Sequence, residues 1–101
     1  MTDDPLGPVH PGEVLREEFL APLRITPYAL AAALHVPRTR IERLVREETS
    51  ITVDTALRLG RYFRTSPEFW LRLQSLFDLE TVTLKELDDD IASIVPLRKR
   101  A

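Results

Sequence analysis

Four arginines lie within nine residues of one segment, and they are the most distinctive chemical feature of the sequence. The stretch VPRTRIERLVREETS, residues 36–50, places them at Arg38, Arg40, Arg43 and Arg46. A guanidinium group can form two parallel hydrogen bonds to a guanine edge or to a phosphate. Arginines at this density therefore predict either recognition of a nucleic acid or a solvated helix surface, and charge alone does not separate the two.

The charge of the chain is divided unevenly along its length. The 101 residues carry a net charge of −2. Residues 24–64 hold eight arginines against four acids, whereas residues 1–23 and 65–101 are each net acidic. Because a polyanion responds to the local field, the acidity of the whole chain does not exclude DNA as a partner of the middle segment.

Composition argues against several other kinds of protein. The sequence has no cysteine, which excludes disulfides, thiolate metal sites and cysteine nucleophiles. No apolar run approaches about 18 residues, and Asp3 and Asp4 stand where a signal peptide would be basic. His10 and His35 are the only histidines and belong to no H-E-x-x-H motif. We therefore expect a cytoplasmic protein that is not an enzyme and binds no metal or other cofactor.

The arginines must be positioned by helices, because the patterning is helical almost throughout and only three glycines are present. Prolines and capping residues predict where these helices begin and end. The expected segments are residues 13–20, ended by Pro22; 27–34, capped by Thr26 with Pro27 at the first position; 38–46, opened in the same way by Pro37; 53–63, after Thr52; and 67–77, capped by Ser66.

A sixth helix, with one apolar side, is expected from Leu84 to Val95. Thr83 and Glu86 form a T-x-x-E capping box at its start. Its apolar residues recur at alternating three- and four-residue steps, at Leu84, Leu87, Ile91 and Ile94. This spacing suits either contact with a second chain or packing onto the protein's own core, and both remain open.

Residues 38–46 separate into two faces when they are placed on a helix of about 3.6 residues per turn. The inner face is formed by Ile41, Leu44 and Val45, and the outer face by Thr39, Arg43 and Arg46. A short support helix, a tight turn and a second helix with outward arginines are typical of a helix-turn-helix, whose second helix enters the major groove of DNA. The alternative is that the arginines pair along the helix surface, Arg43 with Glu47 and Glu42 with Arg46.

The expected fold is therefore all-α. We predict one compact five-helix repressor-like domain over residues 1–101, with a helix-turn-helix at about residues 26–46. The C-terminal extension, residues 81–101, adds the amphipathic helix.

Longer motifs are more specific than this general pattern. They are HPGEVLREEFLAPL, TPYALAAALHVPRTRIERLV, ITVDTALRLGRYF and TSPEFWLRLQSLFDLE, which run from about His10 to Glu80. Together they resemble the HigA-type antitoxins, a branch of the phage-repressor-like (XRE) helix-turn-helix family. The resemblance implies a homodimer that binds palindromic operator DNA in its own promoter. It also implies a HigB toxin as partner, an mRNA-cleaving ribonuclease of the RelE fold that the antitoxin neutralises.

The resemblance also implies roles for individual residues. The base-reading positions of the second helix are matched by Arg38, Thr39 and Arg43. The start of the support helix, which contacts phosphate, is matched by Thr26, Pro27 and Tyr28, and the expected phosphate neighbours are Arg40 and Arg46. Two features depart from the family pattern: His35 stands where glycine is usual, and the acidic segment REETS follows the second helix.

Two further surfaces are candidate contacts with proteins. The apolar arc in PEFWLRLQSLF is wider than one helix face needs, so part of it is expected to join the C-terminal helix in a dimer contact. The expected dimer residues are Phe69, Trp70, Leu73, Leu87, Ile91 and Ile94. Acidic side chains could imitate RNA phosphates towards a basic ribonuclease, or could simply be solvated. They are residues 88–90 and Asp3, Asp4, Glu13, Glu17 and Glu18.

The sequence thus favours an antitoxin that also represses its own operon. The first alternative is a stand-alone repressor-like regulator without a toxin. The second is a protein-interaction module that has lost DNA binding, which the REETS segment makes conceivable.

Overall fold

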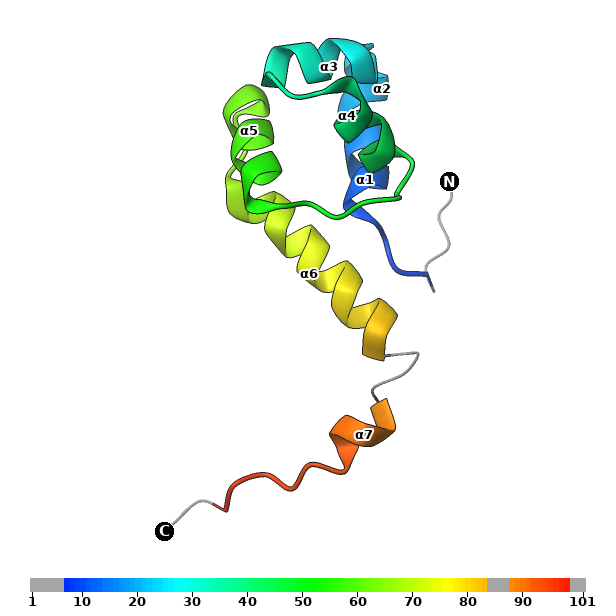
Figure 1. Ribbon diagram of the computed structural model, residues 1–101, viewed down its shortest axis with the longest axis vertical. Coiled ribbons are helices and arrows are strands. Elements are labelled where there is room, and N and C mark those ends of the chain that lie inside the picture. Colours follow the sequence, from blue (N-terminus) through cyan, green and yellow to red (C-terminus); the bar gives the residue numbers. More distant parts are fainter. Residues whose placement is uncertain (1–6, 84–87, 99–101) are drawn as a thin grey trace.

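The computed structural model describes residues 7–83 and 88–98, which form a series of helices (Figure 1). These residues contain no β-strand, and the expected all-α fold is confirmed. In Figure 1, the helices up to α5 surround a common core, and α6 runs from this core towards the C-terminal end. None of the described helices combines the length and the apolar character needed to cross a membrane.

The first helical segment is longer than predicted and passes through Pro22. It consists of α1 (Pro11–Val14), the π-helix η1 (Leu15–Leu20) and α2 (Ala21–Leu23). In its wider turn, the Ala21 N–H donates to the Arg16 carbonyl five residues earlier. The predicted end at Pro22 is wrong: Pro22 lies in the first turn of α2, directly after the π-helix, and proline is tolerated in a first helical turn. The chain leaves the helix at Arg24, whose backbone is left-handed with φ of 57°.

Helices α3 (Pro27–Leu34) and α4 (Arg38–Val45) form the predicted helix-turn-helix. Thr26 caps α3 as expected, since its Oγ1 accepts a hydrogen bond from the Ala29 N–H at 3.0 Å. His35 has a φ of 62°, a conformation that favours glycine, and its N–H donates to the Ala32 carbonyl at 3.2 Å. Pro37 is the N-cap of α4 and not its first helical residue, so the prediction for Pro37 is wrong by one position.

Helices α5 (Val53–Phe63) and α6 (Pro67–Thr83) begin at the predicted caps. The Thr52 hydroxyl accepts from the Thr55 N–H at 3.2 Å, and the Ser66 hydroxyl accepts from the Phe69 N–H at 3.1 Å. Between the two helices, the chain turns at Arg64, where φ is 63°. Helix α6 extends beyond the predicted residue 77, to Thr83.

The core takes apolar side chains from η1, α3, α4, α5 and α6. The largest of those that are fully buried are Leu15, Leu30, Ile41, Leu44, Leu59 and Trp70. Each contributes about 1.5–3 kcal/mol through removal of apolar surface from water. A close backbone contact adds to this packing: a Cβ placed on Gly12 would lie 1.8 Å from the Leu44 carbonyl oxygen. Gly12 therefore allows the start of α1 to lie directly against α4.

The C-terminal helix α7 (Asp88–Ala92) ends before Val95, the predicted end of this helix. Thr83 is the last residue of α6, and its side chain, like the predicted start of the helix, lies outside the described part of the chain. The other half of the capping box, Glu86, lies outside the described residues, as do Leu84 and Leu87. Residues 94–98 have no regular secondary structure, and the side chains of Ile91 and Ile94 are exposed. An apolar spacing alone does not maintain a helix whose apolar side is not covered.

Candidate nucleic-acid interface

The outer face of α4 is cationic and open to solvent. Arg38, Thr39, Arg40, Arg43 and Arg46 are all exposed. The opposite face is firmly buried, with Ile41 fully inaccessible, Leu44 at 1 % exposure and Val45 packed against the core. The predicted division into an inner and an outer face is confirmed, and the buried side fixes the direction in which the arginines point.

The start of α3 lies close to the start of α4. The Arg38 guanidinium lies over the ring of Tyr28, 5.8 Å from its centroid, and Tyr28 is 65 % exposed. Thr26 is also exposed, and Pro27 is half-buried beside it. The two helix starts therefore present a cation, an aromatic ring and a capping hydroxyl on one surface. Such an arrangement offers both charge and hydrogen-bonding groups to a polyanion.

The arginines of α4 differ in whether a carboxylate holds them. Arg38 Nε lies 3.3 Å from Glu42 Oε2, and Arg40 Nη1 lies 2.5 Å from Asp54 Oδ2. Within residues 7–83 and 88–98, no carboxylate lies within 4.0 Å of Arg43 or Arg46.

The surface pairs that offered an alternative explanation for these arginines, Arg43–Glu47 and Glu42–Arg46, do not form between the described side chains. Glu47 has left the helix with φ of 65°, and its carboxylate pairs with Arg16 instead. Among the described residues, Arg43 and Arg46 therefore lack the local counter-charge that a merely solvated helix surface would supply.

The C-terminal end of α4 is held by Arg16, a residue that the sequence analysis did not single out. Arg16 Nη1 donates a hydrogen bond to the Val45 carbonyl, and Nη2 lies 3.3 Å from Glu47 Oε2. Hydrogen bonds to Glu17 and Glu47 raise the pKa of Arg16, so its charge is permanent. The carbonyl at the end of a helix carries partial negative charge, which a cation stabilises. No local spacing links Arg16 to α4, so only the fold reveals this contact.

A groove of about 680 Å³ separates α4 from the N-terminal half of α5. It is lined by Thr39, Arg40 and Arg43 from α4 and by Asp54 and Arg58 from α5. Hydrogen bonds from Arg58 and then Arg40 lower the pKa of Asp54, so its carboxylate is ionised at neutral pH. The sequence analysis missed Asp54 and Arg58, although their four-residue separation on a predicted helix is a signal of pairing.

The histidines have structural positions. His10 is 5 % exposed and caps α1, where its Nδ1 accepts from the Gly12 N–H at 2.8 Å, and its ring lies edge-on to Phe77 at 4.8 Å. His35 forms the turn between α3 and α4 and is exposed. Among the described residues, no group of three side chains could hold a metal ion. The cap formed by His10 gives this histidine a structural role at the start of α1.

The apolar residues predicted to form a dimer contact are divided between core and surface. Trp70 is fully buried, and its indole N–H donates to the Thr65 hydroxyl at 2.8 Å, so it has no surface to offer a second chain. Its assignment to a dimer contact is therefore corrected to a core position. Leu73 is half-buried and packs against the core, and Phe69 is 37 % exposed. The prediction for Leu87 lies outside the described residues.

Two apolar side chains in the second half of α6 are more than half exposed. Leu76 is 56 % exposed and Leu79 is 63 % exposed. Leu76 belongs to the predicted apolar arc but was not among the expected dimer residues, and Leu79 lies beyond the predicted end of the helix.

Comparison with known proteins supports this arrangement. A family model described as helix-turn-helix matches residues 15–70. Virulence-associated protein I of Dichelobacter nodosus is 49 % identical over 88 % of this chain and 81 % of its own length. Antitoxin HigA-1 of Vibrio cholerae is 40 % identical over 71 % of this chain and 68 % of its own. The solved structure of Pseudomonas aeruginosa antitoxin HigA with the higBA promoter is 46 % identical, covers 90 % of this chain and 99 % of its own, and has a TM-score of 0.84.

The fold and the exposed face of α4 define a helix-turn-helix protein. Within that class, the chain belongs to the HigA-type antitoxin family. Proteins of this family are DNA-binding regulators and not enzymes.

Proposed function

We propose that this protein binds operator DNA as a homodimer, represses its own operon and neutralises a toxin. The observation that carries the proposal is the outer face of α4, where Arg43 and Arg46 are exposed without a carboxylate partner among the described residues. An arginine that pairs with no carboxylate can neutralise a DNA phosphate directly. This neutralisation releases counterions from the DNA, which makes binding more favourable. The HigA structure from Pseudomonas aeruginosa, which includes promoter DNA, supports the same role here.

In this proposal, α4 lies in the major groove with its N-terminal half towards the bases. Arg38, Thr39 and Arg43 read base edges, with bidentate hydrogen bonds from arginine to guanine as the strongest contacts. The start of α3, with Thr26, Pro27 and Tyr28, lies against the DNA backbone, where open N–H groups of the first helical turn donate to phosphate. Arg40 and Arg46 lie at the margins of the groove and contact phosphate.

The dimer follows from the geometry of operator recognition. One α4 can cover only one half-site, and two half-sites one helical turn apart require two chains related by twofold symmetry. The apolar surface that suits this contact comprises Phe69 and Leu73 together with Leu76 and Leu79 of α6. Ile91 and Ile94 are also exposed and offer further apolar area to a second chain.

The proposed toxin is an mRNA-cleaving ribonuclease of the RelE fold. Support comes from the kinship with antitoxin HigA-1 of Vibrio cholerae and from acidic side chains outside the DNA-binding face. Glu17 and Glu18 are exposed on η1, and Asp89 and Asp90 are exposed on α7. A nuclease that binds RNA is expected to be basic, so these carboxylates suit its surface by charge.

The DNA-binding half is tested by fluorescence anisotropy on DNA from immediately upstream of the gene and on scrambled DNA over a salt series. Tight binding to the upstream DNA alone, retained at about 150 mM salt, is the expected result. Equal and weak binding to both would contradict operator recognition. Co-purification with the product of the adjacent gene then separates an antitoxin from a stand-alone regulator, because only the antitoxin holds that partner.

A further inference from the structure

Asp54 stands at an unusual place for a carboxylate, within the surface proposed to meet DNA. Among the described residues that line the groove between α4 and α5, it is the only acid, and three arginines line the groove with it: Arg40, Arg43 and Arg58. A negative charge here opposes DNA binding unless it is balanced. The contacts of Asp54 show how its charge is balanced.

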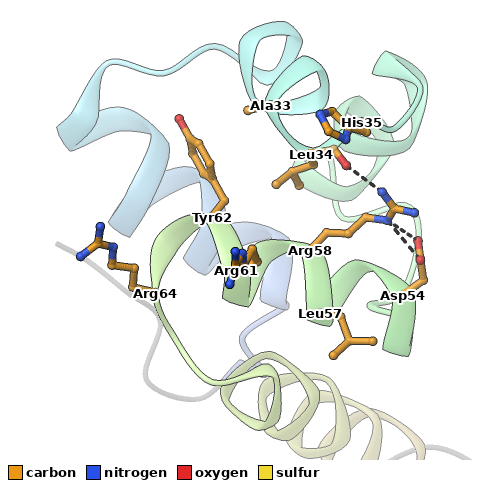
Figure 2. Close-up of a pocket in the computed structure, with 9 residues that line it drawn as sticks. All are labelled: Ala33, Leu34, His35, Asp54, Leu57, Arg58, Arg61, Tyr62 and Arg64. Atoms are coloured by element: carbon orange, nitrogen blue, oxygen red, sulfur yellow. Dashed lines mark hydrogen bonds and ion pairs between the residues drawn. The ribbon is translucent and has the colours of Figure 1, made fainter.

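Two arginines hold the Asp54 carboxylate. Arg58 Nε lies 3.1 and 3.0 Å from its two oxygens, and Arg58 Nη1 donates to the Leu34 carbonyl at 2.9 Å (Figure 2). Arg58 thereby fixes Asp54 relative to the end of α3. The second arginine is Arg40, whose Nη1 lies 2.5 Å from Asp54 Oδ2. Arg40 is thus bound by a carboxylate that is itself held in place.

A guanidinium group binds carboxylate and phosphate oxygens through the same donors. Arg40 Nη1, the donor that binds Asp54, cannot be given in full to a DNA phosphate at the same time, and the Asp54 charge offsets the charge of Arg40. Arg43 lines the same groove but has no carboxylate within 4.0 Å among the described residues. Of these two groove arginines, Arg43 has no described carboxylate to leave, whereas Arg40 must first be released from Asp54.

We propose that Asp54 competes with DNA phosphate for Arg40 and so sets the absolute affinity of this protein for DNA without changing its base preference. The inference rests on the proposed DNA-binding function. It adds to that function a residue, Asp54, that contacts Arg40 of the protein itself and not the DNA. Since a phosphate contact carries no sequence information, releasing Arg40 strengthens binding to every DNA by the same factor. Exposed ion pairs of this kind are individually weak, so the expected factor is small, about two- to fivefold.

The test is Asp54→Asn, measured by anisotropy on upstream and scrambled DNA over a salt series. We expect binding about two- to fivefold tighter on both DNAs at about 150 mM salt, with a slope of log K against log salt steeper by about one unit. Glu68→Gln is the matched control, since it removes the same charge from an exposed residue at the start of α6, beyond the far end of α5.

A double-mutant cycle tests whether the effect of Asp54→Asn on DNA binding depends on Arg40. In the Arg40→Ala background, Asp54→Asn should give no further gain, because the arginine that it releases is gone. A gain that persists in that background, that equals the gain from Glu68→Gln, or that is absent altogether would overturn the inference. Asp54→Ser, which also keeps a small polar residue in the first turn of α5, replaces Asp54→Asn if the asparagine variant lowers the melting temperature.

The outcome also separates this inference from the proposed function. If the wild-type protein binds upstream and scrambled DNA equally, operator recognition fails, while competition for Arg40 is still measured on either DNA. If the wild-type protein prefers the upstream DNA and Asp54→Asn changes nothing, only the competition fails. If it binds no DNA at any salt concentration, both are refuted.

Discussion

Helices α4 and α6 each expose side chains that their own packing does not require, but the chemistry of those side chains differs. On α4 the exposed groups are cations, and Arg43 and Arg46 have no carboxylate partner among the described residues. On the second half of α6 they include apolar side chains, with Leu76 and Leu79 more than half exposed beside the charged Asp78 and Glu80. The first surface suits a polyanion, because its attraction is electrostatic, and the second suits another protein, because its attraction comes from burial of apolar area.

Both helices depend on a buried side, which separates residues that stabilise the fold from residues that bind partners. Ile41 and Leu44 fix the orientation of α4, and Trp70 fixes the orientation of α6. Mutations on the buried side should change stability, and mutations on the exposed side should change binding. The following predictions test that division from the largest expected effect to the smallest.

Trp70→Ala should have the largest effect. Trp70 is fully inaccessible and packs with Phe19 at 5.0 Å and Phe69 at 5.0 Å between ring centroids. Loss of this side chain leaves a cavity and is expected to lower the free energy of unfolding by about 3–5 kcal/mol. Urea denaturation at low protein concentration measures it, with the exposed Leu79→Ser on the same helix as control. An equal loss from both variants would break the distinction between the two sides of α6.

Arg43→Ala should affect DNA binding and leave stability unchanged. The guanidinium is exposed and holds no carboxylate among the described residues, so its removal breaks no ion pair of the fold. We expect a loss of about 1–3 kcal/mol in operator binding and a relaxed preference at one base pair. Competition with operators substituted one base pair at a time measures both. If binding became weaker on every sequence with no change in base preference, Arg43 would contact the DNA backbone and not a base.

Arg46→Ala provides the contrast within α4. Arg46 is the C-cap of α4, at the end of the helix away from the predicted base-reading positions, and is expected to contact phosphate. Its loss should weaken binding to all sequences alike by about 1 kcal/mol or less and should flatten the salt slope by about one unit. The same anisotropy titrations with Arg43→Ala in parallel measure this. If Arg46→Ala altered preference at a single base pair, the assignments of Arg43 and Arg46 would have to be exchanged.

The smallest predicted effect concerns pH and lies outside both binding surfaces. Burial lowers the pKa of His10 from its ordinary value of 6.5, although Glu47, the Thr49 backbone and Asp78 partly oppose this. The folded protein therefore binds fewer protons than the unfolded chain below about pH 6.5. Stability should be constant above that pH and should fall as the pH is lowered through it, by less than about 1.4 kcal/mol per pH unit.

Urea denaturation between pH 7.5 and 5.5 measures this dependence. His10→Asn is the matched control, because asparagine also caps helix starts but does not titrate. The variant should show a flatter dependence than the wild type. Identical pH dependence in both proteins would show that His10 does not contribute.

The predictions from sequence succeeded where a local signal determines the structure. Thr26 and Ser66 cap their helices through hydrogen bonds over three residues, and the two faces of α4 follow from helical periodicity. Contacts between distant residues gave no such signal. The bond from Arg16 to the Val45 carbonyl spans 29 residues, and that from Arg40 to Asp54 spans 14.

Apolar spacing was the least reliable signal. On α6, it did not reveal that Trp70 faces the core while Leu76 and Leu79 face solvent. On the C-terminal segment, the spacing predicted a helix to Val95, but α7 ends at Ala92. Both errors have one physical reason: which apolar residues are covered depends on the neighbouring elements, and a periodic pattern does not identify those elements.

The most direct test of the central claim is a cross-saturation NMR experiment on the isotope-labelled protein bound to operator DNA, with saturation transferred from DNA protons to protein amides. The claim that α4 meets DNA while α6 meets protein predicts attenuation at the amides of Thr26, Tyr28 and residues 38–46 and none at Leu76 and Leu79. Attenuation centred on α6, with the amides of α4 unaffected, would contradict it.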